Sequence, residues 1–512
     1  MATVQLDALI PREDFEIDEK TTQPSLSQTI KISDLESSAF FYHSLRKPDF
    51  QRETSDWTTE KICDFIKSFL DGDLIPAIIL WNAGKFTFAI DGAHRLSALI
   101  SWVNDDYGDG FFSKAFFDQN IPEEQKNIAE KTRNKVNRDI GSYKDHSEAI
   151  RNQVKVNTII LERAQKLGYI AIQLQWVNGG AEKAEASFFK INQKAVTINS
   201  TEIDLLLSRK KPNAIAARAI VRSGTGHKYW SKFSLDNQEE IQNLAKEINE
   251  ILFTPKLITP VKSINLPIAG QGYSARSLSL ILDFVNISNN FDNKTVLDND
   301  LDGQATIKML KKSKRIAQRI LGNHSSSLGL HPAVYFYSIT GKHQPTAFLA
   351  VVELIKDFEA KDFYKKFMQV RLQFENYLLK NKQISNQVTL KYGSGIKGYR
   401  QLKEVFKSII YFFLVQDGNE EVTTKLKDKY NYLSFDITES YETNSQDFSE
   451  GIKSAIFIRE AIANSVKCKL CYCMVHKNSI SFDHIERIAD GGKGMADNGQ
   501  IAHFYCNSTL KN

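Results

Sequence analysis

Metal-binding residue types are concentrated in the last 45 residues of the chain. Four of the five cysteines lie there, and Cys468 and Cys471 are separated by the same two-residue gap as His503 and Cys506. Two such pairs, presenting thiolates and one imidazole, are typical of a single tetrahedral zinc site. We therefore expect a structural zinc on these four residues, with the extra thiol of Cys473 as an alternative to Cys471. The cysteine pairs alone could also form a structural zinc ribbon that carries no chemistry.

A second group of polar residues lies between the two pairs. Asp483 and His484 are adjacent, and Asn498 follows them. A carboxylate and an amide can hold a hard divalent cation, while a neutral imidazole deprotonates water, which together suit hydrolysis of a phosphodiester. In a strand, neighbouring residues point to opposite faces, so the pair must lie where a strand ends or bulges if both are to reach one site.

This order of residues resembles the HNH, or ββα-metal, endonuclease family. Asn498 follows His484 by 14 residues and Asn507 follows it by 23, the spacings of that family, and Gly491 and Gly492 match its glycine connector. The resemblance implies that His484 is the general base and that Asp483 and Asn507 bind a catalytic Mg²⁺ or Mn²⁺. It also implies that Asn498 braces the loop and orients the histidine.

Another candidate site lies near the N-terminus, where an apolar run over 86–90 ends in Asp91-Gly92 and a helical pattern begins. The free N–H groups at the start of that helix, with Arg95 and Arg52, could hold a phosphate, and Asp91 could hold a cation or a water. The alternative is that Asp91 caps the helix, Gly92 makes a turn and the arginines are surface residues.

The order Gln-Arg, Trp, Ile-Pro, strand, Asp-Gly-x-x-Arg resembles the ParB/sulfiredoxin-like Asp-Gly-Gln-Gln-Arg domain. That domain forms the N-terminal half of GmrSD-type type IV restriction endonucleases and of phosphorothioate-sensing proteins. The resemblance covers roughly residues 35–210, although the motif here reads Asp-Gly-Ala-His-Arg and is closer to the Asp-Gly-Gln-His-Arg variant. It implies a sensor of DNA modification or of a nucleoside triphosphate, with phosphate-binding residues Arg52, Asp91, Gly92, His94 and Arg95.

The periodicity of apolar residues predicts the helices and strands that position these sites. It predicts a helix through residues 62–70 that ends at Gly72, strands over 77–81 and 86–90, and long helices from about 202 to 460. Two of these helices carry basic runs, which are usually solvated helix faces and alternatively face DNA. His324 and His331, in a loop rich in glycine and serine, are expected at the surface. The basic runs comprise Lys308, Lys311, Lys312, Lys314, Arg315 and Arg319, then Lys361, Lys365, Lys366 and Arg371.

The predicted fold class is therefore α+β. It combines a ParB-like α/β domain (35–205) after a polar N-terminal arm (1–34), a mainly helical domain (206–460) and a small zinc-stapled ββα-metal unit (461–512). With 512 residues, 42% hydrophobic and 25% charged, the chain is neither a disordered protein nor a small disulfide scaffold. It has no apolar run of membrane-spanning length and no secretory signal, and its odd, clustered cysteines favour a metal site in a reducing cytoplasm.

These features predict a prokaryotic anti-phage or restriction-type DNA endonuclease. Its zinc-stapled tail would cut and its N-terminal domain would sense phage or modified DNA, or a nucleotide. The net charge of +5 permits a polyanionic partner without requiring one. No membrane partner is expected, and a homo-oligomer is compatible with the sequence. Two other functions stay open: a nucleotide-regulated DNA-binding adaptor with a non-catalytic HNH fold, and a nuclease that acts on RNA.

Overall fold

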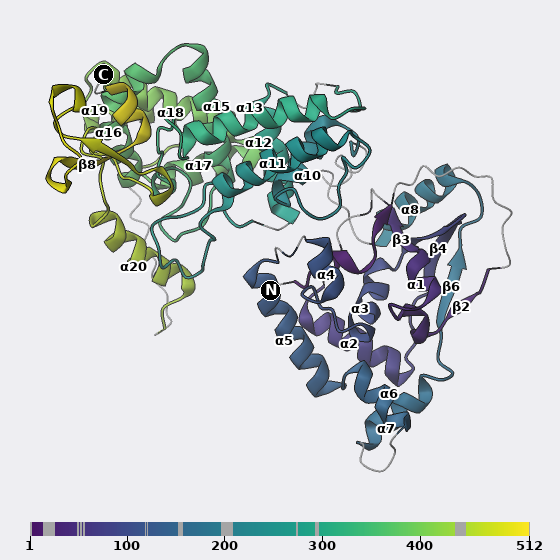
Figure 1. Ribbon diagram of the computed structural model, residues 1–512. Helices are drawn as coiled ribbons and strands as arrows, with labels where there is room; N and C mark the ends of the chain where they lie inside the picture. The colour runs from purple at the N-terminus through teal and green to yellow at the C-terminus, as the bar shows by residue number, and fades with distance from the viewer. Residues whose placement is uncertain are drawn as a thin grey trace. The chain divides into compact units, whose positions relative to one another are not determined.

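The computed structural model forms two compact units, Met1–Arg209 with Thr225–Tyr229 and Lys210–Gly224 with Trp230–Asn512 (Figure 1). The predicted fold class is confirmed: the first unit contains a mixed sheet, the second is mainly helical, and a small β-hairpin with a cysteine–histidine cluster follows the helices. The structure describes residues 3–13, 26–48, 51, 54, 57–117, 119, 121–151, 157–195, 208–272, 275–291, 296–435 and 447–510.

A six-stranded sheet in the order β1-β3-β5-β4-β6-β2 organises the first unit. The β4–β5 and β6–β2 pairs are antiparallel and the others are parallel. The segment that precedes residue 35 supplies both edge strands, β1 and β2. The strands are β1 (Arg12–Glu13), β2 (Thr29–Ile30), β3 (Leu45–Pro48), β4 (Ile78–Ala83), β5 (Phe86–Asp91) and β6 (Ile172–Trp176).

Alternation along β4 and β5 divides the apolar residues between two cores, because successive side chains of a strand point to opposite faces. Leu80 and Ala89 join the larger core with α2 (Thr59–Asp71) and α3 (Ala93–Val103). Trp81 and Phe88 face the other way and pack with α8 (Ala181–Ala195). The sheet is thus covered on both faces.

Helix α2 forms as its sequence predicts. The side chain of Thr58 accepts a hydrogen bond from the Lys61 N–H at 3.4 Å and caps the first turn, and Gly72 ends the helix with a φ of 84°. The other helices of this unit are η1 (Asp7–Leu9), η2 (Ile32–Leu35), α1 (Phe40–Ser44), α4 (Phe111–Phe116), α5 (Glu123–Asp139), α6 (Tyr143–Arg151) and α7 (Thr158–Lys166).

Packed helices build the second unit. Helix α15 (Pro345–Ala360) is apolar on nearly every side and lies in the core, as expected of a helix without a polar face. The others are α10 (Pro212–Val221), α11 (Leu235–Phe253), α12 (Ala275–Ser288), α13 (Gln304–Ile320), α14 (Pro332–Tyr335), α16 (Tyr364–Lys380), α17 (Gln383–Tyr392), η4 (Gly395–Lys397), α18 (Tyr399–Leu414), α19 (Asn419–Lys429) and α20 (Glu450–Ala463). No helix among the described residues is both long and apolar enough to cross a membrane.

The tail after α20 consists of short elements that pack on these helices. The backbone N–H of Tyr505 donates to the carbonyl of Ser327 at 3.0 Å, and the hydroxyl of Ser508 donates to the carbonyl of Ser325 at 2.9 Å. The tail therefore shares its packing with the helical part. Its elements are η5 (Lys477–Ser479), β7 (Ser481–His484), η6 (Ile488–Asp490), η7 (Ala496–Asn498), β8 (Gly499–Ala502) and the π-helical turn η8 (Cys506–Leu510).

Candidate nuclease tail and sensor pocket

Two tight turns bring the predicted zinc ligands together. The first turn is closed by the Cys468 N–H, which donates to the Cys473 carbonyl at 2.9 Å, and the second follows β8. The ligand atoms of Cys468, Cys471, His503 and Cys506 all lie within 4.8 Å of one another. Cys473, the alternative ligand, is buried but is not part of this group.

The geometry of His503 fits a metal ligand. Its Nε2 lies 3.0 Å from the carbonyl of Met474, so an Nε2–H donates there and Nδ1 is the nitrogen left for a metal. This Nδ1 lies 3.3 Å from Cys471 Sγ and 3.8 Å from Cys506 Sγ. Ligands at about 2.3 Å for sulfur and about 2.0 Å for nitrogen around a tetrahedral zinc are separated by about 3.5–3.8 Å. The hydrogen bond with Cys468 also lowers the pKa of Cys471, which favours the thiolate that zinc requires.

A fully buried arginine joins the helices to this cluster. On α16, Arg371 donates from Nε to Glu375 at 2.7 Å, from Nη1 to the Leu328 carbonyl at 2.6 Å and from Nη2 to the Gly329 carbonyl at 3.2 Å. Gly329 has a φ of 62°, and a Cβ there would lie 2.4 Å from Cδ2 of His503. The arginine thus fixes the backbone that packs on a predicted zinc ligand.

The candidate catalytic residues lie at the end of β7. Asp483 is buried and its carboxylate accepts a hydrogen bond from Nε2 of Gln500, its partner in β8, at 2.8 Å. His484, the last residue of the strand, is half-buried. The alternation of buried and exposed residues along β7 therefore separates the two side chains across the strand.

Asn507 lies on the same side of β7 as Asp483. Its Nδ2 donates to Ser481 Oγ at 2.8 Å and to the Phe482 carbonyl at 3.3 Å, and Ser481 and Asp483 share one face of the strand. A carboxylate and an amide oxygen on one face form a donor set that suits a hard cation such as Mg²⁺ or Mn²⁺.

The side chain of Asn498 holds the loop that follows His484. Its Oδ1 accepts from the Glu486 N–H at 2.7 Å, and its Nδ2 donates to the carbonyls of Glu486 at 3.2 Å and Lys493 at 2.9 Å. Gly492 is close-packed in the same loop, because a Cβ there would lie 2.0 Å from the Glu486 carbonyl. This network fixes the backbone that leads out of β7.

At the Asp-Gly turn of the first unit, Asp91 does not cap the helix that follows, contrary to the helix-cap alternative. Asp91 ends β5, and Gly92 is the cap residue of α3, with a φ of 93°. The Asp91 carboxylate accepts a hydrogen bond from Nη2 of Arg95 at 2.5 Å. Arg95 Nη1 donates to the carbonyls of Pro76 and of Ala77, the latter at 3.3 Å, so Arg95 ties the start of β4 to the end of β5. Arg52 lies outside the described residues.

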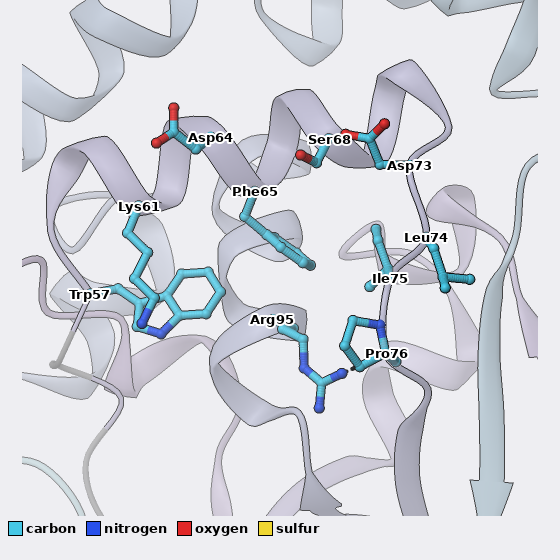
Figure 2. Close-up of a pocket in the computed structure, with 10 residues that line it drawn as sticks. All are labelled: Trp57, Lys61, Asp64, Phe65, Ser68, Asp73, Leu74, Ile75, Pro76 and Arg95. Carbon is cyan, nitrogen blue, oxygen red and sulfur yellow. Dashed lines mark hydrogen bonds between the residues drawn. The ribbon is translucent and has the colours of Figure 1, made fainter. Parts of the chain in front are cut away.

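Beside this turn lies a pocket of about 520 Å³, into which Arg95 projects (Figure 2). The ring of His94 stacks on Trp57, with centroids 6.0 Å apart and planes 26° apart. The pocket is lined by Trp57, Lys61, Asp64, Phe65, Ser68, Asp73, Leu74, Ile75, Pro76 and Arg95. The structure therefore brings Asp91, His94 and Arg95 to one region.

Residues 32–208 match the family model of the N-terminal domain of the GmrSD restriction endonuclease. This match confirms the predicted resemblance of the first domain, which we call the GmrSD-like domain. No curated protein and no solved structure matches the chain. That family is described as a restriction endonuclease, and the match covers only the N-terminal domain.

The motif of the GmrSD-like domain included Trp57, Ile75 and Pro76 as well as Arg95, but it did not assign the pocket residues of α2 to a site. Phe65 belongs to the apolar period of α2 and packs against the same core as Ile62 and Ile66, while Lys61 is exposed on that helix. Neither position therefore signalled the wall of a pocket. In the first basic run of the second unit, Lys311, Lys314 and Arg315 pair with acids on other helices. Lys311 contacts Glu240 at 2.7 Å, and Arg315 contacts Glu359.

Proposed function

We propose that this protein is a restriction-type DNA endonuclease whose tail hydrolyses phosphodiester bonds under the control of the GmrSD-like domain. The observation that carries the proposal is the arrangement at β7. Asp483 and His484 end the strand, and Asn507, next to the predicted zinc ligand Cys506, binds the same strand through Ser481.

His484 is the proposed general base. As the last residue of β7 it is partly open to solvent, where its imidazole can take a proton from the water that attacks phosphorus. Asn498 keeps the loop after His484 in place and so limits how far this base can move. Asp483 and Asn507 would hold a divalent cation, which when bound supplies charge stabilisation at the phosphate.

The zinc cluster has a structural role in this proposal. Because Asn507 directly follows Cys506, closing the cluster places the Asn507 amide beside β7. The few apolar residues of the tail form only a small core, around Cys468, Val475, Ala502 and Cys506, so a metal contributes folding free energy here.

The GmrSD-like domain is the proposed sensor. Its Asp-Gly-Ala-His-Arg turn and the adjacent pocket offer a place where a nucleotide or a modified base could bind. Arg95 holds the turn together through Asp91 and Pro76, so its proposed role combines structure with ligand contact.

Cleavage of supercoiled plasmid and phage DNA in Mg²⁺ or Mn²⁺, with and without ATP and GTP, tests the nuclease. His484→Ala should lower the rate about 10²- to 10⁴-fold and leave DNA affinity unchanged. His324→Ala is the matched control, because His324 is exposed and its ring contacts only Ser326 among the described residues. Undiminished cutting by His484→Ala, or full cutting in EDTA, would place the chemistry elsewhere. Binding without cleavage would favour the adaptor function, and preferential cutting of RNA would favour the RNA nuclease.

A further inference from the structure

Two hollows flank a short ridge in the GmrSD-like domain. Leu74, Ile75 and Pro76, which connect α2 to β4, line both the pocket of about 520 Å³ and a second one of about 460 Å³. Leu74 is 99% exposed, although burying a leucine side chain is normally favourable. An apolar side chain held in solvent between two hollows is suited to insertion into a partner.

The walls of the first hollow suit a flat ring. On one side, Trp57 is held by the edge of Phe65, with centroids 5.3 Å apart and planes 72° apart, and by the stacked ring of His94. On the other side lie Ile75 and Pro76, as Figure 2 shows. The Lys61 ammonium lies over the Trp57 ring, 5.0 Å from its centroid. A heteroaromatic ring that displaced this flexible side chain would lie between the indole and an apolar wall, where it gains stacking and buries its faces.

The polar groups around this hollow indicate which flat ligand fits. Ser68, Asp64 and Asp73 lie along one rim, from α2 and the residues after it, and the two exposed carboxylates point away from Arg95 (Figure 2). Carboxylates at the rim can accept hydrogen bonds from the amino groups of bases. Arg95 makes three hydrogen bonds to the protein, which use three of the five N–H groups of its guanidinium and leave two for a ligand.

The charges of the lining disfavour a free nucleoside triphosphate. Two cations, Lys61 and Arg95, are opposed by two carboxylates, Asp64 and Asp73, so the lining is neutral overall. A triphosphate would bring several negative charges close to those carboxylates, whereas a base is uncharged and its phosphates stay in the DNA backbone.

We propose that the first hollow receives a nucleobase rotated out of a DNA duplex, while Leu74 fills the space that the base leaves in the stack. Enzymes that handle single bases use such rotation, and apolar wedges between base steps stabilise the opened duplex. The volume exceeds that of a pyrimidine ring and leaves room for a substituent. This proposal rests on the proposed sensing of modified DNA and names the ligand of the sensor.

The second hollow supports a DNA partner on the other side of the wedge. Its wall includes Gln173 and Gln175, which alternate outward along β6. Glutamine amides both donate and accept, so they can hydrogen-bond the edge of an unpaired base or the sugar–phosphate backbone.

The test uses the full chain carrying His484→Ala and duplexes with a cytosine or 5-hydroxymethylcytosine next to 2-aminopurine, whose fluorescence rises when its neighbour leaves the stack. Binding should raise the fluorescence. Trp57→Ala should weaken binding of the modified duplex about 5- to 150-fold, the range for losing one stacked base. Leu74→Ser should abolish the fluorescence rise without affecting folding, because the side chain is in solvent.

Phe111→Ser, at an exposed position on α4 of the same unit, is the control and should behave as the parent protein. Unchanged fluorescence on binding, or a rise that persists in both pocket variants, would overturn base rotation. Competition by ATP or GTP at the Trp57 pocket would replace the base with a free nucleotide. The fluorescence measures binding and base rotation, not cleavage. If the chain without the His484→Ala substitution rotates the base but does not cut DNA, only the cleavage proposal is refuted.

Discussion

Replacing Arg371 by methionine should destabilise the second unit strongly, because the substitution removes a charge from a closed network. The side chain of Arg371 is 0% exposed and that of its partner Glu375 is 3% exposed. Without the guanidinium, the Tyr335 hydroxyl at 2.9 Å is the one hydrogen-bond partner that the described residues leave to the Glu375 carboxylate, and the carbonyls of Leu328 and Gly329 lose a donor. Removing one partner of a buried ion pair costs about 3–5 kcal/mol, so we expect a loss of that size.

Urea unfolding of the zinc-loaded protein measures this free energy, and the double variant makes the test selective. Glu375→Leu alone should also cost about 3 kcal/mol or more, whereas Arg371→Met/Glu375→Leu should cost less than either single change, since no charge is left buried alone. Arg315→Met is the control: that arginine pairs with Glu359 but is 69% exposed, and exposed pairs contribute about 0–1 kcal/mol. A loss below about 1 kcal/mol in Arg371→Met, or single losses that simply add in the double variant, would refute the reasoning.

Three further predictions follow from other sites. Cys506→Ser, or removal of metal by a strong chelator, should lower the melting temperature and expose the tail to protease, and an unchanged digestion pattern would argue against a structural metal. Gly92→Ala should cost at least about 1–3 kcal/mol in thermal unfolding, because the φ is 93° and the new Cβ would lie 2.4 Å from Ile78 Cδ1, while Gly168→Ala should cost little. Burial lowers the pKa of His476 from 6.5 to about 4. As the pH falls, the unfolded chain therefore binds a proton before the folded chain does, and the free energy of unfolding should fall by up to about 3 kcal/mol between pH 6.5 and 4. His476→Asn keeps an acceptor for the Asn478 N–H but cannot titrate, so it should flatten the dependence of stability on pH between 6.5 and 4. An unchanged slope over that range would contradict this role of His476.

Features set by neighbouring residues could be predicted from the sequence. The apolar period and a following glycine were enough to predict α2 and its end at Gly72. The cysteine and histidine spacing likewise predicted the cluster at Cys468 and His503, because each pair lies on one short turn. In both cases the signal lies within a few residues of the chain, although the packing of the tail brings the two cysteine–histidine turns together.

Features that depend on distant packing could not be predicted. His331 was expected at the surface because its loop is rich in glycine and serine, but it is fully buried and its Nδ1 accepts a hydrogen bond from the Ala333 N–H at the start of α14. Arg371 belongs to a basic run, yet the fold turns it inward beneath the tail. Asp91 was a candidate helix cap, and its carboxylate binds Arg95 instead. Each outcome depends on the groups that the folded chain packs around the residue, which a local sequence pattern does not contain.

The close approach of Gly329 to His503 has a consequence for how such proteins diversify. Any side chain at position 329 would collide with the imidazole, so the two positions are constrained jointly although 174 residues separate them. A tail acquired by recombination would function only on a helical part whose loop before α14 already carries glycine at that point. Among homologues, we therefore expect residues 329 and 503 to be inherited together, and the helical part and the tail to be exchanged as one block.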